Sequence, residues 1–253
     1  MTLKWLDTGD HGSARDFELE GSRRRVTGAL WLPEDTHIDA PMVLMGHGAS
    51  GDRYQAPIPH LARRFVTEAG FPVLAIDGPV HGLRKVAPGG REAFSEEMSR
   101  PGFTQDMVAD WHDGFAAVTV DKGIGQGPLG YFGLSMGTIL GLPLLASTMA
   151  FTTSVIGLAG TKGAGKPVAE LLLDAAAKVD HPVLFLMQLE DELFPRDGYL
   201  ALFDAVRAQD KRLHANPGLH PEIPTEEIDH AFAFLKSHLS GTATRQITNP
   251  LAE

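Results

Sequence analysis

One serine lies between two glycines in the segment GLSMG, residues 133–137, directly after a short apolar run. This spacing matches the pattern G-x-S-x-G, in which a sharp turn between a strand and a helix presents a serine hydroxyl for attack on a carbonyl carbon. Bulky residues two positions to either side of such a turn would clash, which accounts for Gly133 and Gly137. Ser135 is therefore a candidate nucleophile.

A serine hydroxyl is a weak nucleophile until a neighbouring base takes its proton. The chain has 11 histidines, so position has to select the base. His220 ends the segment NPGLH, a loop that follows the last expected strand, and we predict it as the base. His214 lies within that strand. His230 and His238 lie on the expected final helix, and we predict structural or solvent-exposed roles for all three.

A histidine base needs a carboxylate that fixes its tautomer and stabilises the imidazolium. The segment QLEDELFP, residues 188–195, follows an apolar run and contains Glu190, Asp191 and Glu192. We predict Asp191 as this carboxylate, because Pro195 four residues later suggests the turn that follows it. A plain solvated loop is the alternative interpretation of three adjacent acids.

Acyl transfer also requires backbone N–H groups that bind the developing oxyanion. The first expected donor is the amide of Met136, the residue after the nucleophile. The second is the amide of Ala49, because the glycines of the segment GHGASGD, residues 46–52, allow a close approach to substrate. Such donors contribute about 2.7–4 kcal/mol each. His47 in the same segment is expected to anchor the loop.

The elements that must position these residues follow from the periodicity of apolar residues. Short apolar runs predict strands at 17–20, 26–32, 42–46, 72–78, 128–133, 154–160, 182–187 and about 211–215. Helical spacing predicts helices at 57–69, 105–120, 136–147, 168–179, 198–209 and about 225–239. Apolar strands that alternate with helices predict an α/β fold, with a mostly parallel central sheet flanked by helices on both faces and an opening antiparallel pair. Ligands of such sheets bind at the carboxyl ends of the strands, where the candidate residues lie.

The composition limits the class of protein. With 253 residues, 43% of them apolar, the chain can form a globular core, and we expect one domain over residues 1–253. A net charge of -10 argues against nucleic acid or an anionic membrane as a partner. The absence of cysteine excludes disulfides and cysteine nucleophiles. The N-terminus has no apolar stretch that fits a signal peptide or membrane helix, so we expect a cytoplasmic protein, and the oligomeric state stays open.

Four segments together resemble the α/β-hydrolase superfamily: the strand with its HG loop, the GLSMG turn, the ED-x-x-x-P loop and the PG-x-H loop. The match runs from about residue 26 to residue 240, and the order serine, aspartate, histidine is that of the superfamily. The short loops are similar to the dienelactone-hydrolase-like and small-esterase branch, although serine stands where dienelactone hydrolases have cysteine. The resemblance implies an α/β-hydrolase fold without a large cap domain.

The resemblance also implies a serine hydrolase that cleaves carboxylic esters of small to medium acyl chain through an acyl-enzyme, with a small-molecule substrate and no cofactor. Amide, lactone and thioester hydrolysis on the same three residues stay open as alternatives. Trp111 and Phe194 are apolar candidates for the substrate cleft. His81, in the segment DGPVHG, is a candidate either for substrate contact or for a hydrogen bond that anchors its loop.

Two other classes of function have weaker support. The segment GTKGAGKP, residues 160–167, nearly matches the phosphate loop G-x-x-x-x-G-K-[ST], but Pro167 stands where that loop has a hydroxyl residue. A nucleotide-binding protein is thus a remote alternative. So is a non-catalytic binding protein, which would lack one of the three candidate residues. No HExxH motif or paired His/Asp spacing stands out, so no metal is expected.

Overall fold

A single twisted sheet of nine strands runs through the part of the chain that the computed structural model describes, which is residues 2–7, 14–86 and 91–244. The strand order is β1-β2-β3-β5-β4-β6-β7-β8-β9. The strands span Leu3–Trp5 (β1), Ala14–Glu20 (β2), Arg25–Trp31 (β3), Met42–Gly46 (β4), Val73–Ile76 (β5), Leu129–Leu134 (β6), Phe151–Gly157 (β7), Val183–Gln188 (β8) and Lys211–Asn216 (β9).

The sheet is antiparallel at its N-terminal edge and parallel elsewhere. β1, β2, β3 and β5 pair antiparallel in that order, whereas every pairing from β5 through β4 to β9 is parallel. β4, β5, β6 and β8 are buried along their whole length, which is why they read as continuous apolar runs. Because the parallel strands share one direction, the loops that follow β4, β6, β8 and β9 meet at one edge of the sheet.

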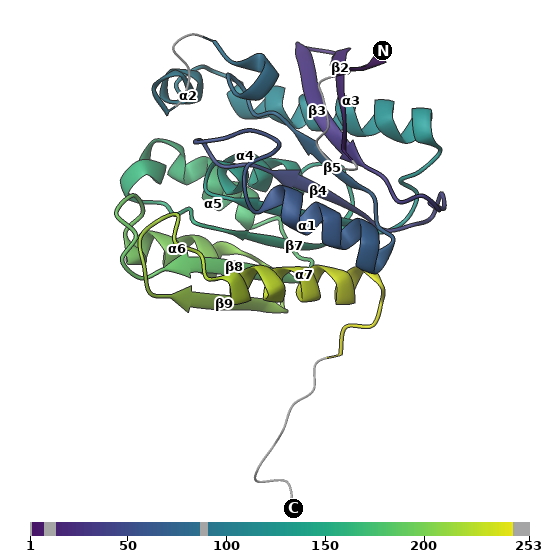
Figure 1. Cartoon of the computed structure of the whole chain (residues 1–253). Helices are drawn as coiled ribbons and strands as arrows, with labels where there is room; N and C mark the ends of the chain where they lie inside the picture. The colour runs from purple at the N-terminus through teal and green to yellow at the C-terminus, as the bar shows by residue number, and fades with distance from the viewer. Residues whose placement is uncertain (1, 8–13, 87–90, 245–253) are drawn as a thin grey trace, which may run out of the picture.

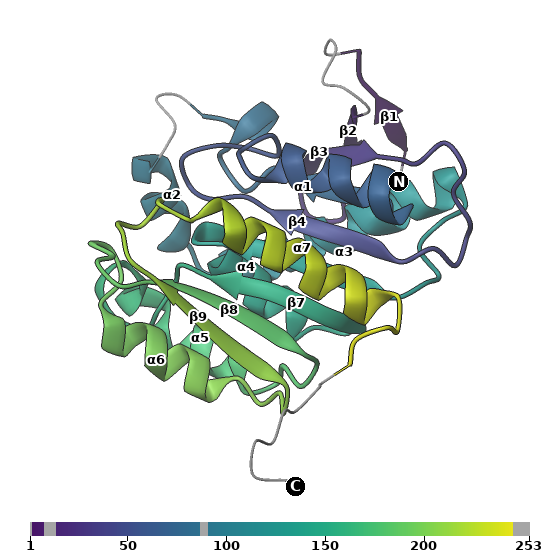
Figure 2. The same ribbon diagram turned by 60° about the horizontal axis from the view of Figure 1, so that its bottom comes forward.

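Helices cover both faces of the sheet, as Figure 1 and Figure 2 show. One face carries α1 and α7, and α7 packs on β6 and β7. The other face carries α3, α4, α5 and α6, packed side by side in that order. In the described residues the α-helices span Ile58–Arg64 (α1), Arg91–Met98 (α2), Phe103–Lys122 (α3), Met136–Leu145 (α4), Ala169–Ala176 (α5), Arg196–Ala205 (α6) and Thr225–Leu239 (α7). Short helical turns span Phe65–Ala69 (η1), Gly82–Arg84 (η2) and Gly163–Val168 (η3).

The expected mostly parallel α/β sheet with helices on both faces is confirmed, and no large cap is present among the described residues. β1, α2 and the short turns η2 and η3 were not expected from the sequence. β1 has only three residues and is held by its antiparallel register with β2, where Leu3 lies opposite Leu19. α2 follows a stretch rich in glycine and proline, and its few apolar residues gave no clear helical stripe.

Candidate active site

The turn between β6 and α4 holds Ser135 in a strained conformation. Its φ of 57° and ψ of -118° lie in a region that residues other than glycine rarely adopt. Its N–H donates to the Gly157 carbonyl oxygen at 2.9 Å, which ties the turn to β7. A Cβ at Gly133 would lie 2.6 Å from Tyr131 Oη, and one at Gly137 would lie 2.5 Å from the Gly46 carbonyl oxygen. The turn therefore requires glycine at both positions.

The loop between β9 and α7 brings His220 to this serine. His220 Nε2 lies 2.9 Å from Ser135 Oγ, although the two residues are 85 positions apart. On the other side of the ring, Nδ1 lies 2.7 Å from Asp191 Oδ2. His220 is only 7% exposed. The three side chains thus form one continuous line of hydrogen bonds, and their roles in a reaction stay a prediction.

Asp191, which lies in the loop after β8, is held by four hydrogen-bond donors. Its Oδ1 accepts the N–H groups of Leu193 and Phe194 at 2.7 and 2.9 Å. Its Oδ2 accepts Tyr199 Oη–H in addition to the His220 ring. Burial by itself would raise the pKa of the Asp191 carboxyl, but these hydrogen bonds outweigh it and the pKa is lowered. Asp191 is therefore a fixed anion beside His220.

The two neighbouring acids anchor the backbone that carries His220. Glu190 Oε2 accepts the Gly218 N–H at 2.5 Å, and Glu192 Oε2 accepts the His220 N–H at 3.0 Å. Both acids are therefore tied to the loop after β9 and do not contact the imidazole. All three adjacent acids thus contact the loop after β9, and only Asp191 reaches the imidazole.

The two residues predicted to donate to an oxyanion line the same cavity as Ser135. Met136 is the first residue of α4, so its N–H has no acceptor within the helix. Met136 and Ala49 both line the cavity into which Ser135 opens. Arg53, which follows the loop after β4, ties it to the neighbouring strands. Its guanidinium donates to Asp16 on β2 at 2.8 Å and to Asp77 after β5 at 3.0 Å. The Ala49 carbonyl oxygen itself lies 3.0 Å from His81 Nε2, which fixes this part of the loop.

His47 anchors the same loop. The Gly78 N–H donates to His47 Nε2 at 2.7 Å, so Nδ1 carries the proton and donates to the Gly48 carbonyl oxygen at 2.8 Å. Burial lowers the pKa of His47 to about 4, although the hydrogen bond to Gly48 opposes this shift and His81 adds to it. Burial also lowers the pKa of His181, in the turn before β8, to about 4.

Because the pKa values of these two buried histidines are lowered, we expect the protein to lose stability in mild acid. Between pH 4 and pH 6.5, a buried imidazole with a lowered pKa takes up a proton mainly when the chain unfolds. Its contribution to the free energy of unfolding is therefore complete above the pKa of unfolded histidine, about 6.5, and falls as the pH drops towards 4. For His47 alone we expect the free energy of unfolding to be about 2 kcal/mol lower at pH 5 than at pH 7. Urea unfolding at both pH values measures this difference. The variant His181→Asn should show a smaller difference than the wild type, and equal stability of the wild type at both values would contradict the prediction.

An apolar cavity of about 410 Å³ opens beside Ser135 and His220. Phe194, one of the predicted cleft residues, lines it, and its ring centre lies 5.5 Å from that of His220. Phe94 and Met98 of α2 line another part of the wall. Further apolar lining comes from Ile58, Ile139, Leu158, Leu193 and Ile223. The segment that resembles a phosphate loop also contributes, since Ala164 and Pro167 lie on the same cavity.

The structure does not bring His81 and Trp111 to this cavity. The His81 ring nitrogens lie 2.6 Å from the Pro79 carbonyl oxygen and 3.0 Å from the Ala49 carbonyl oxygen, so the ring anchors the loop and is not among the described lining residues. Trp111 is fully buried and packs edge-to-face on Tyr131 beneath the turn. His81 thus contacts the loop after β4, and Trp111 packs on β6, without either residue lining the cavity.

Several residues of the site were not predicted from the sequence, and three of them show why. Tyr199 holds Asp191 from α6, and Phe94 and Met98 reach the cavity from α2. Tyr199 lies eight positions after Asp191, and a tyrosine at the first turn of the following helix has no recognisable signature in a single sequence. For Phe94 and Met98 the spacing of four residues was the available signal, but the surrounding residues are polar.

Several solved esterase structures resemble this chain along most of its length. A PEG-bound cold-adapted esterase from an Arctic intertidal metagenomic library is 32% identical, with a TM-score of 0.81, and the match covers 93% of this chain and 99% of that one. A zinc-bound structure of such an esterase from the same source is 33% identical over the same shares, with a TM-score of 0.77. The acetyl xylan esterase of Paenibacillus sp. R4 is 14% identical, with a TM-score of 0.72 over 94% of this chain and 88% of that one, which shows a shared fold alone.

No family model and no curated protein matches the sequence. Along the described residues, no helix combines the length and the apolar run that a membrane crossing needs.

Proposed function

Since the chain belongs to the α/β-hydrolase superfamily and matches an esterase along nearly its whole length, we propose that it is a serine carboxylesterase with Ser135 as nucleophile. The observation that carries this proposal is the line of hydrogen bonds from Asp191 through His220 to Ser135 Oγ, at 2.7 and 2.9 Å, at the wall of an open cavity. A buried line of this kind, ending on a strained serine, matches what acyl transfer requires.

The reaction follows from the same geometry. Ser135 Oγ attacks the ester carbonyl carbon while His220 Nε2 takes its proton, and Asp191 stabilises the imidazolium that forms. The amides of Met136 and Ala49 donate to the carbonyl oxygen as it becomes negative. His220 then protonates the leaving alcohol. In the second half, His220 removes a proton from water, which attacks the acyl-enzyme and releases the acid.

The cavity supports substrates with small to medium acyl chains. Its volume of about 410 Å³ lies near the lower end of the range for small-molecule sites, and its walls are mostly apolar. Each methylene that enters such a cavity contributes about 0.8 kcal/mol, or about fourfold in kcat/KM. The gain should end once the cavity is full, because the next methylene has to stay in water.

A panel of p-nitrophenyl esters of rising chain length tests this proposal. We expect kcat/KM to rise over the first members, to pass a maximum at medium length and to fall for long chains. The variant Met98→Trp narrows the cavity and should move the maximum to shorter chains, whereas Met98→Ala should move it to longer ones. Met149, which packs against the core outside the described cavity lining, provides the control Met149→Ala, with an unchanged maximum. A maximum at the longest chains, or no hydrolysis of any ester, would contradict the proposal.

A further inference from the structure

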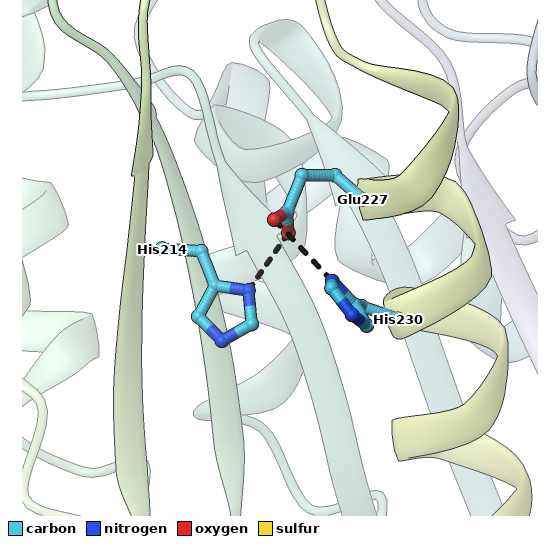
Figure 3. A group of neighbouring side chains, drawn as sticks. All are labelled: His214, Glu227 and His230. Carbon is cyan, nitrogen blue, oxygen red and sulfur yellow. Dashed lines mark hydrogen bonds and ion pairs between the residues drawn. The ribbon is translucent and has the colours of Figure 1, made fainter.

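Outside the proposed active site, two histidines and one glutamate point into the space between β9 and α7, as Figure 3 shows. His214 comes from β9, and Glu227 and His230 come from the first two turns of α7. Glu227 Oε2 lies 2.8 Å from His214 Nδ1, and Glu227 Oε1 lies 3.4 Å from His230 Nδ1. One ligand atom from each residue lies within 4.8 Å of the other two.

These separations fit a small divalent cation. Zinc binds histidine nitrogen and carboxylate oxygen at about 2.0–2.1 Å, so two ligands of a tetrahedral ion lie roughly 3.3–3.4 Å apart. The pair Glu227 Oε1–His230 Nδ1 already has this separation, and the pair Glu227 Oε2–His214 Nδ1 would have to open by less than an ångström. The three ligand atoms lie within 4.8 Å of one another, so the widest pair would close as the side chains turn towards the ion. Two histidines and one carboxylate are a known donor set for zinc, with water in the fourth position.

The burial of Glu227 gives a second reason. Glu227 is 5% exposed, and its ion-pair partners among the described residues are these two histidines, which carry a positive charge only when protonated. Buried carboxylates are normally paired with a charge or coordinated to a metal. Glu227 also lies in the first turn of α7, where the helix dipole favours negative charge.

The site is also open to solvent. His214 and His230 line a surface hollow of about 370 Å³, and their side chains are 33% and 57% exposed. A hydrated cation can therefore reach the three ligand atoms and keep a water molecule. We propose that His214, Glu227 and His230 form a zinc-type cation site that fastens β9 to α7. These two elements flank the loop 217–224, which carries His220, so the ion would hold both ends of that loop without entering the active site.

Titration of the untagged, chelator-treated protein with ZnCl₂ tests this site by calorimetry and by the shift of Tm. We expect one zinc ion per chain and a higher Tm with zinc, because the ion binds the folded state. Glu227→Gln and His230→Gln should each weaken zinc binding by about tenfold or more and remove the shift of Tm. His60, an exposed histidine on α1, provides the matched control His60→Gln, with unchanged binding.

The same measurements on Ser135→Ala keep this test independent of the proposed function, because that variant should bind zinc as the wild type does. Replacing zinc by Co²⁺ gives a second readout, since a tetrahedral site produces an intense visible absorption band that Glu227→Gln should lose. Circular dichroism checks that the variants are folded, and His230→Gln alters an exposed side chain. Less than one-tenth of an equivalent bound by the wild type, or a loss of affinity below tenfold in both variants, would overturn the proposal.

Discussion

Replacing Ser135 by alanine is expected to lower kcat for p-nitrophenyl acetate by about 10⁵- to 10⁶-fold, the loss known for the nucleophile of a serine hydrolase. The variant has no oxygen that can attack the carbonyl, whereas the amides of Met136 and Ala49 and the cavity stay in place. The residual rate should therefore exceed that of the uncatalysed reaction. Alanine and serine resist a φ of 57° to a similar degree, so the free energy of unfolding should change by less than about 1 kcal/mol.

Steady-state kinetics and urea unfolding measure both quantities. Ser95→Ala is the matched control, because Ser95 lines the same cavity but is exposed on α2. It should keep kcat within about twofold, the range expected for a surface substitution. Substantial activity of Ser135→Ala, in a preparation free of contaminating esterase, would exclude Ser135 as the nucleophile.

Replacing Asp191 by asparagine is expected to lower kcat by about 10⁴-fold, the loss seen when the acid of such a triad becomes an amide. The amide oxygen can still accept the N–H groups of Leu193 and Phe194, so the NH₂ group would face His220 Nδ1. Nδ1 would then have to accept a hydrogen bond, and the ring proton would move to Nε2. In that tautomer His220 cannot take the proton of Ser135.

Glu190→Gln and Glu192→Gln are the controls for this prediction, because both acids contact the backbone of the same loop but not the imidazole. An amide oxygen can accept the same N–H groups, so each variant should lose less than about tenfold in kcat. Measurement of kcat and KM for all three variants compares the adjacent acids directly. A larger loss of kcat in either glutamate variant than in Asp191→Asn would show that Asp191 is not the acid that orients His220.

The sequence contained enough information to bring the right loops to one edge of the sheet. The apolar runs identified the parallel strands, and their ends predicted where Ser135, Asp191 and His220 would meet. The choice among three adjacent acids was harder. Glu190 and Glu192 lie on the same loop, and only the tertiary arrangement decides which carboxylate faces the ring.

The sequence did not predict contacts between residues of different elements when no local spacing links them. Trp111 lies on an apolar helical stripe, and periodicity does not say whether such a residue faces the core or a cavity. Tyr199 reaches Asp191 from a helix whose angle to β8 is set by packing. The sequence shows the Glu-x-x-His spacing of residues 227–230 in the proposed cation site. It does not show that His214, 13 positions before Glu227 and on β9, lies beside this pair.

Labelling with a fluorophosphonate probe, followed by mass spectrometry of the peptides, tests the central claim most directly. The probe forms a covalent bond only with a nucleophile that has been activated. We predict one phosphonate per chain, attached to Ser135, no adduct in Ser135→Ala and a greatly slowed reaction in Asp191→Asn. A phosphonate on any other residue, or an unlabelled protein that still hydrolyses esters, would contradict the account.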